Sequence, residues 1–121
     1  MSTTNAYLAV FVGSKTSPRR LAWDRLPVNE RCAQEQEGMA AWKAWVEQHR
    51  AAIVTFGGPL GKTKKVSQSG VSDVGNQMAA FTIVCADSHE AAAAMFERHP
   101  HFMIFPGDAI EVMPVLPVPE R

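Results

Sequence analysis

Two stretches of this sequence are apolar at both odd and even positions, and they constrain the fold more than any other feature. One spans Ala6 to Val12 and the other spans Met78 to Cys85. A strand with one face in water alternates apolar and polar residues, whereas a run that is apolar at both parities is typical of a strand covered on both sides. We therefore predict two central strands in a sheet.

The segments around these runs predict helices and further strands. Ser17 followed by Pro18 is typical of the start of a short helix, and Asn29 is a candidate N-cap for a long helix that runs to about residue 50. Asp87 begins a stretch with an acidic first turn, which predicts the start of the second main helix. Further strands are predicted at residues 51–56 and 109–115, and residues 64–69 are predicted to pair as a short arm.

The long predicted helix has one apolar face. Its residues at steps of three and four are Glu35, Met39, Trp42, Val46 and His49. Side chains at this spacing lie on one side of a helix, so we predict that this side packs against the sheet. The large aromatic residues on it either fill the core or line a ligand pocket.

The order of these elements is β-α-β-β-α-β, which predicts an α+β, ferredoxin-like fold with an antiparallel sheet. Two helices cover one face of a four-stranded sheet. The other face would carry the remaining apolar residues of the central strands, and a second copy of the chain is the simplest cover for it. We predict a homodimer packed sheet to sheet, with one domain at residues 6–116 and tails at 1–5 and 117–121.

Composition excludes several classes of protein. Twelve Lys and Arg residues balance twelve Asp and Glu residues, and a chain without excess positive charge is a poor nucleic-acid binder. No stretch has the roughly 18–20 apolar residues of a membrane span, and the first residues do not resemble a secretory signal, so a cytoplasmic location is expected. Cys32 and Cys85 lack the spacing of a disulfide framework or zinc site. Nothing resembles a flavin or haem motif, and we predict no cofactor.

The segment Gly61-Lys62-Thr63 has the ending of a phosphate-binding loop but not its beginning. That motif needs a glycine five residues before Gly61, where this chain has Phe56, and Pro59 removes a backbone donor from the loop. We therefore expect a solvated hairpin, in which Lys62 remains a candidate contact for an anionic or polar group.

The segment His99-Pro100-His101 is the strongest chemical signal. Histidines at a helix end supply a base, an acid or metal ligands, or else stabilise the helix end as cations. No carboxylate or cysteine stands at metal-ligand spacing from them, so no metal site is predicted. Asp108 lies seven residues after His101 and would orient its imidazole if the loop folds back.

Several segments, in their order and spacing, resemble the YCII-related family. They are residues 58–67 (GPLGKTKKVS), 70–73 (GVSD), 99–102 (HPHF) and 110–112 (IEV). The likeness covers about residues 6–116 and implies a dimeric α+β barrel, in which two sheets close a barrel across the dimer around a small pocket in each protomer. Some relatives are thought to use a His–Asp pair with the histidine on the first long helix.

In this chain the corresponding helical stretch, residues 39–42, contains no histidine. The substitutes are His101 paired with Asp73 or with Asp108. A base acts only within about 2.6–3.2 Å of the proton that it takes, or through a water molecule. Geometry therefore decides between these pairs.

These observations lead to a functional hypothesis and two alternatives. The first is a cytoplasmic homodimer that binds a small organic ligand, with acid/base chemistry of lyase or isomerase type carried by His101. The alternatives are a non-catalytic small-molecule-binding or regulatory dimer, and a cofactor-independent oxygenase. The expected pocket residues are apolar walls with a few polar contacts: Trp42, Phe56, Pro59, Phe102, Phe105, His99, Lys62 and Ser72.

Overall fold

A computed structural model describes residues 5–119. Residues 1–4 and 120–121, which fall in the predicted tails, lie outside the described residues. The elements in chain order are β1 (Ala6–Val12), α1 (Pro18–Asp24), α2 (Val28–His49), a 3-10 turn (Arg50–Ala52), β2 (Ile53–Pro59), β3 (Thr63–Ser67), β4 (Gly70–Val74), β5 (Met78–Cys85), α3 (His89–Ala94), α4 (Pro100–Met103) and β6 (Ala109–Pro114).

The main sheet has four antiparallel strands in the order β2-β5-β1-β6. The two strands that are apolar at both parities, β1 and β5, are its central strands, as the sequence predicts. Pro114 ends the edge strand β6, where a missing backbone donor is tolerated. The predicted α+β, ferredoxin-like arrangement is confirmed.

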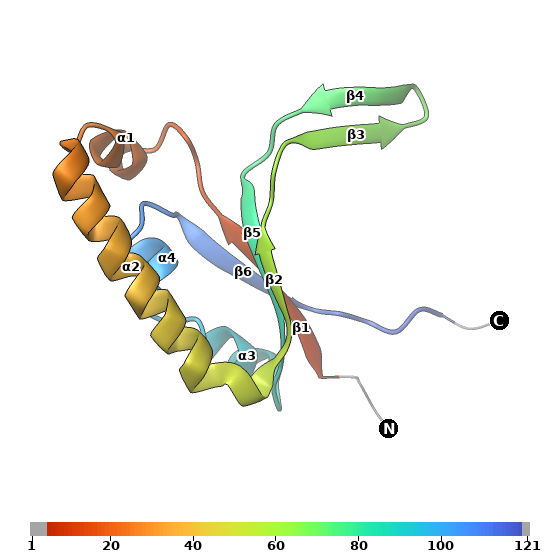
Figure 1. The fold of residues 1–121 in the computed structure, drawn as a ribbon. Helices are drawn as coiled ribbons and strands as arrows, with labels where there is room; N and C mark the ends of the chain where they lie inside the picture. The colour runs from red at the N-terminus through yellow and green to blue at the C-terminus, as the bar shows by residue number, and fades with distance from the viewer. Residues whose placement is uncertain (1–4, 120–121) are drawn as a thin grey trace.

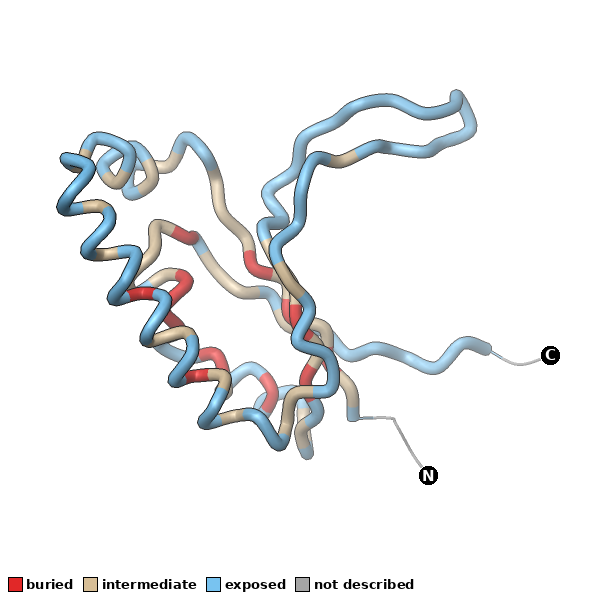
Figure 2. Tube along the Cα trace, in the orientation of Figure 1, coloured by how far each residue is buried: buried red, intermediate tan, exposed pale blue. Residues whose placement is uncertain are grey.

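The helices lie on one side of this sheet, and the opposite side faces away from them (Figure 1). The buried residues lie between α2, α3, α4 and the sheet (Figure 2). On β1 they are the alternate residues Tyr7, Ala9 and Phe11, and on β5 they are Thr82 and Val84. The core therefore occupies only the helix side of the sheet.

Two predicted helix starts differ from the observed ones. Ser17 caps α1 as predicted, because its hydroxyl accepts from the backbone N–H of Arg20 at 3.1 Å. The cap of α3 is Ser88 and not Asp87, since the extended Ser88 places its hydroxyl 3.0 Å from the Ala91 N–H. The long helix α2 begins without a side-chain cap, one residue before the predicted Asn29.

The buried face of α2 is also rotated from the predicted one. Met39 is 62% exposed, whereas Gly38 and Trp45 are buried. The reason is the aromatic ring of Phe105, which lies so close to Gly38 that a Cβ at this position would collide with it. A glycine within the apolar stripe thus marks the place where a loop side chain packs against the helix.

Strand β2 contains a bulge, and a separate hairpin follows the strand. Gly57 has a φ of +68°, and a Cβ there would collide with the Phe81 carbonyl oxygen, so the bulge requires glycine. Beyond it, β3 and β4 form a two-stranded sheet that extends away from the domain as an arm (Figure 1). The predicted arm at 64–69 is the outgoing half of this hairpin and its turn.

Within residues 5–119, none of the helices combines the length and the hydropathy that crossing a bilayer requires.

Candidate functional site

An apolar cavity of about 410 Å³ lies between α2 and the helix side of the sheet. Its two buried polar side chains are His101 and Thr82, and the Thr82 hydroxyl donates to the Thr55 carbonyl at 2.8 Å. The lining residues are Phe11, Met39, Trp42, Trp45, Val46, Ile53, Phe56, Gly58, Pro59, Ala79, Ala80, Phe81, Thr82, His101 and Phe105. A cavity of this size and composition suits one small ring.

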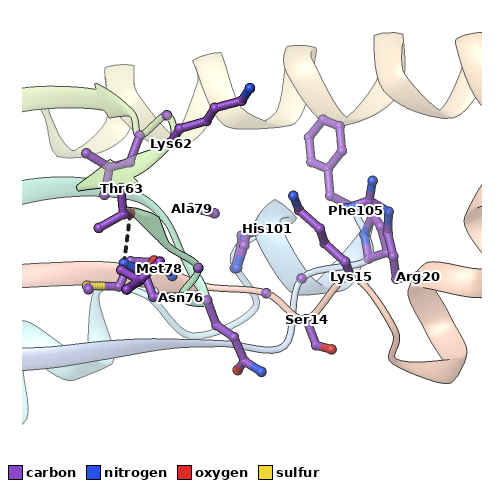
Figure 3. A pocket seen from close by; sticks show the side chains of 18 of the residues that line it. Ser14, Lys15, Arg20, Lys62, Thr63, Asn76, Met78, Ala79, His101 and Phe105 are labelled. Carbon is purple, nitrogen blue, oxygen red and sulfur yellow. Dashed lines mark hydrogen bonds between the residues drawn. The ribbon is translucent and has the colours of Figure 1, made fainter. Parts of the chain in front are cut away.

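A second, larger cleft of about 810 Å³ lies beside it (Figure 3). We call it the basic cleft, because four of its residues carry positive charge, namely Lys15, Arg20, Lys62 and Lys64. It is bounded by the loop after β1, the start of α1, the base of the β3–β4 hairpin and the loop after α4. The apolar cavity and the basic cleft share Ala79, His101 and Phe105.

His101 is therefore the titratable group at the junction of the two cavities. It belongs to the short helix α4, which begins at Pro100. The side chain of His99 caps this helix, because its Nδ1 accepts from the backbone N–H of His101 at 3.0 Å. Gly107 lies directly against the imidazole, and a Cβ there would collide with Cε1 and Nε2 of the ring.

The hydrogen bonds of His101 fix its tautomer. Its Nε2 is 2.9 Å from the Val12 carbonyl oxygen, which can only accept, so Nε2 carries the proton. Nδ1 makes no hydrogen bond within residues 5–119 and keeps its lone pair.

The surroundings keep this imidazole neutral. Burial lowers the pKa of His101, and the nearby Arg19 lowers it further, against the opposing effects of the Val12 and Ala109 carbonyls and of the Asp108 carboxylate. A neutral imidazole with a free Nδ1 is a base, so the site presents a proton acceptor at the junction.

His99 lies behind this site, at neither cavity. Its side chain is fully buried among aromatic rings, and the Trp42 ring is perpendicular to it at 4.5 Å between centroids. Burial lowers the pKa of His99 to about 3, and the neighbouring His101 and His49 add to the effect. Its Nε2 has no hydrogen-bond acceptor among the described residues, and the adjacent aromatic faces are its available partners. His99 acts as a neutral cap that presents His101.

The structure does not join His101 to either candidate carboxylate. Asp73 lies on the exposed hairpin, where it forms an ion pair with Lys64 at 2.6 Å. Asp108 accepts from the backbone N–H of Ser14 at 2.8 Å and is near enough to His101 to affect its pKa. Within residues 5–119, the hydrogen-bond partner of the imidazole is a backbone carbonyl.

The other predicted pocket residues fall into three groups. Four line the apolar cavity, and one of these, Phe105, also borders the basic cleft. Lys62 lines only the basic cleft. Two line neither cavity: Ser72 is exposed on β4, and Phe102 is half-buried on α4. The four in the apolar cavity are Trp42, Phe56, Pro59 and Phe105.

Sequence reasoning missed Arg19 and Lys15. Arg19 donates to the carbonyls of Gly107 at 3.1 Å and of Phe105 at 3.0 Å, and so holds the loop that forms a wall of both cavities. Lys15 lines the basic cleft from the loop after β1. Both residues follow the central strand β1, which ends in a polar loop. This loop meets the loop after α4, so its position in the sequence was the available signal that Lys15 and Arg19 belong to the site. Among the described residues, no group of three or more His, Cys, Asp or Glu side chains is arranged to hold a metal ion.

Comparison with known proteins gives a likeness to solved structures. No family model matches the chain, and no curated protein matches its sequence. Among solved structures, the chain is similar to 5-chloro-2-hydroxyhydroquinone dehydrochlorinase (TftG) from Burkholderia phenoliruptrix AC1100, in complex with 2,5-dihydroxybenzoquinone. The TM-score is 0.51 at 19% identity, over 89% of this chain and 90% of that chain. At this identity the likeness shows a shared fold alone.

Proposed function

We propose that this protein binds a small, partly apolar organic molecule in the cavity beneath α2, and that His101 exchanges a proton with it. The observation that carries the proposal is the placement of His101, a buried neutral imidazole with a free Nδ1 that lines the cavity. Most of the cavity wall is apolar, so a ring is bound mainly by burial of its surface.

The chemistry of His101 suits reactions of lyase or isomerase type. Such reactions begin when a base removes a proton from carbon and end when the proton is returned or a leaving group departs. The Val12 carbonyl holds Nε2–H and leaves Nδ1 to accept the proton, and the resulting imidazolium is stabilised by the same carbonyl and by Asp108. Burial keeps the imidazole unprotonated before reaction.

The solved-structure likeness supports the type of ligand. TftG has the same fold and binds 2,5-dihydroxybenzoquinone, a single oxygenated ring. A ring of this size suits a cavity of about 410 Å³. We also propose that the chain belongs to the YCII-related family, on the order and spacing of the segments that resemble it together with this fold.

One observation favours a second candidate, a non-catalytic binding or regulatory module. Among the described residues no carboxylate hydrogen-bonds to His101, whereas a carboxylate is a common partner of a catalytic imidazole. In this alternative His101 only contributes a hydrogen bond to the bound ring. Proton exchange distinguishes the two candidates.

Binding and proton transfer are tested with the same probe, 2,5-dihydroxybenzoquinone. Calorimetry measures its binding, and NMR in D₂O measures exchange of its ring C–H protons. We expect wild-type protein to bind the probe and accelerate exchange, and His101→Gln to bind it without accelerating exchange. His89→Gln on the exposed start of α3 is the matched control and should behave as wild type. Binding with equal exchange rates in wild type and His101→Gln would favour the non-catalytic module.

The location of the binding site has its own test. Ala80 is half-buried on the helix side of β5, opposite Phe11, and lines the cavity, so Ala80→Phe adds a ring to the cavity wall. We expect this variant to stay folded and lose the probe. Retained binding in a folded Ala80→Phe protein would place the ligand elsewhere.

We further propose that two protomers pack through the open face of the sheet. The central strands direct Leu8, Val10, Phe81 and Ile83 to this face, in the cross-strand pairs Leu8–Ile83 and Val10–Phe81. On β6, Met113 stands opposite Leu8. None of these five residues is buried in the single chain, and a contiguous apolar face of this kind is typical of an interface.

A charge on this face tests the dimer. We expect sedimentation at micromolar concentration to give a dimer for wild type and a monomer for Ile83→Lys, because Ile83 stands opposite Leu8 and Thr55 and burying an unpaired ammonium is costly. Met103→Lys, on the exposed surface of α4, is the control and should remain dimeric. A monomeric wild-type protein would contradict this part of the proposal.

A further inference from the structure

The basic cleft carries positive charge that the protein itself does not neutralise. Arg20 is paired with Asp24 at 3.1 Å, and Lys64 with Asp73 at 2.6 Å. Asp73 is the one carboxylate among the residues that line the cleft. Within residues 5–119, neither Lys15 nor Lys62 forms an ion pair.

The two unpaired lysines line the same cleft as the reactive imidazole. In Figure 3 Lys15 lies beside His101, and Lys62 lies farther from it, at the base of the hairpin. Lys62 comes from the base of the hairpin and Lys15 from the loop after β1, so two segments far apart in sequence bring charge to one cleft. The chain as a whole has no net charge, so this concentration is local.

The basic cleft opens onto the apolar cavity at His101, Ala79 and Phe105. A ring held in the apolar cavity is thus able to extend a substituent past His101 into the cleft. The apolar walls favour an uncharged ring, whereas the lysines favour an anion. The pair of cavities is complementary to a molecule with both parts.

We infer that the ligand is a ring carboxylate, whose ring occupies the apolar cavity and whose carboxylate lies in the basic cleft between Lys15 and Lys62. This assignment rests on the proposed function and adds the substrate class to it. The carboxylate is held near His101, which places the ring atom that bears it close to the base.

A carboxylate fits the basic cleft better than a phosphate does. Phosphate sites use several backbone N–H groups from a glycine-rich loop at the start of a helix. Here Pro59 has no N–H, the N–H of Leu60 donates to the Ala79 carbonyl at 2.9 Å, and the segment leads into a strand. The cleft therefore offers two lysine ammonium groups but no phosphate-binding loop, and this arrangement suits a group with a single negative charge.

Calorimetry with 2,5-dihydroxybenzoate and its neutral analogue 2,5-dihydroxybenzamide tests the assignment. The two probes share the ring and its hydroxyl groups and differ in charge. We expect wild-type protein to bind the acid about tenfold more tightly than the amide, since each partly solvated ion contact contributes modestly. The double variant Lys15→Gln/Lys62→Gln should lose this preference and bind the amide as wild type does.

Lys65→Gln is the matched control, because Lys65 is on the same hairpin and does not line the cleft. It should keep the preference for the acid, and the exposed substitutions should leave the melting temperature unchanged. Equal binding of acid and amide by wild type would overturn the inference while leaving the proposed function in place. Tighter binding of phenyl phosphate than of benzoate would overturn the choice of carboxylate. If 2,5-dihydroxybenzoquinone binds and neither of these two rings does, this inference alone fails. If none of the three rings binds, the proposed function fails and this inference fails with it.

Discussion

The inner wall of the apolar cavity belongs to the buried core, whereas the hairpin side of the basic cleft is exposed. Phe11 on β1 and His101 on α4 are 2% and 7% exposed, and the Trp42 ring of α2 packs against both. Every residue of β4, which contributes to the basic cleft, is exposed. Packing therefore determines the shape of the cavity, and charge determines what the cleft binds.

This difference separates two kinds of substitution. A change behind the cavity alters the stability of the fold and the position of His101 together. A change at the cleft alters binding and leaves the fold in place. The following predictions test that separation, from the largest expected effect to the smallest.

Phe11→Ala should destabilise the protein by about 3–5 kcal/mol, because it removes a buried aromatic ring from the core. Phe11 contacts the rings of Trp42, His99 and His101, so the loss also loosens the cavity wall. Urea unfolding measures the change. On the hairpin, Val71→Ala removes an exposed side chain and should change stability by less than about 0.5 kcal/mol. Comparable losses in the two variants would contradict the comparison.

Acid should destabilise the region behind the cavity through His99. Its pKa of about 3 in the folded protein lies below the ordinary 6.5, so the unfolded chain binds the proton more readily. This contribution to stability is complete above pH 6.5 and is lost as the pH falls toward 3, at about 1.4 kcal/mol per pH unit. Between pH 7 and pH 5 the loss amounts to about 2 kcal/mol.

His99→Asn isolates this effect, because an asparagine side chain still caps α4 and does not titrate. Urea unfolding at both pH values should show a smaller loss on acidification in the variant than in wild type. Equal losses would show that His99 is not the acid-sensitive group.

Arg19→Ala should have a smaller effect, about 1 kcal/mol, because Arg19 is exposed and its two hydrogen bonds hold a loop at the surface. The same variant should weaken ring binding, since the Phe105–Gly107 loop forms a wall of both cavities. Arg25→Ala, at the end of α1, is the control, because its side chain makes no hydrogen bond among the described residues. Unfolding and calorimetry on both variants measure these effects. Unchanged stability and ring binding in Arg19→Ala would contradict the wall assigned to it.

The sequence predicts the fold well because strand burial leaves a direct pattern. The apolar runs at both parities match β1 and β5 residue for residue, and the order of elements follows from them. Helix starts were harder to place, since Asp87 and Ser88 are both good caps and only the end of β5 decides between them. The rotation of α2 depends on Phe105, which lies more than sixty residues further along the chain. The periodicity of the helix sequence alone cannot reveal such a distant contact.

The residue types of the site were predictable from the sequence, but the hydrogen-bond partners of these residues were less predictable. His101 and the aromatic walls follow from their chemistry and spacing. The partner of His101 does not, because a backbone carbonyl carries no sequence signal and Val12 reaches it only through the β1–β6 pairing. Lys15 belongs to the cleft for the same reason, since its position depends on how separate loops meet.

The most direct test of this account is the state of the His101 ring, measured by long-range ¹H–¹⁵N NMR at pH 7. We predict a neutral imidazole with its proton on Nε2, whose signals shift when 2,5-dihydroxybenzoquinone is added while those of His89 do not. A ring that is protonated on Nδ1, that is cationic at pH 7, or that does not respond to the added ring would contradict it.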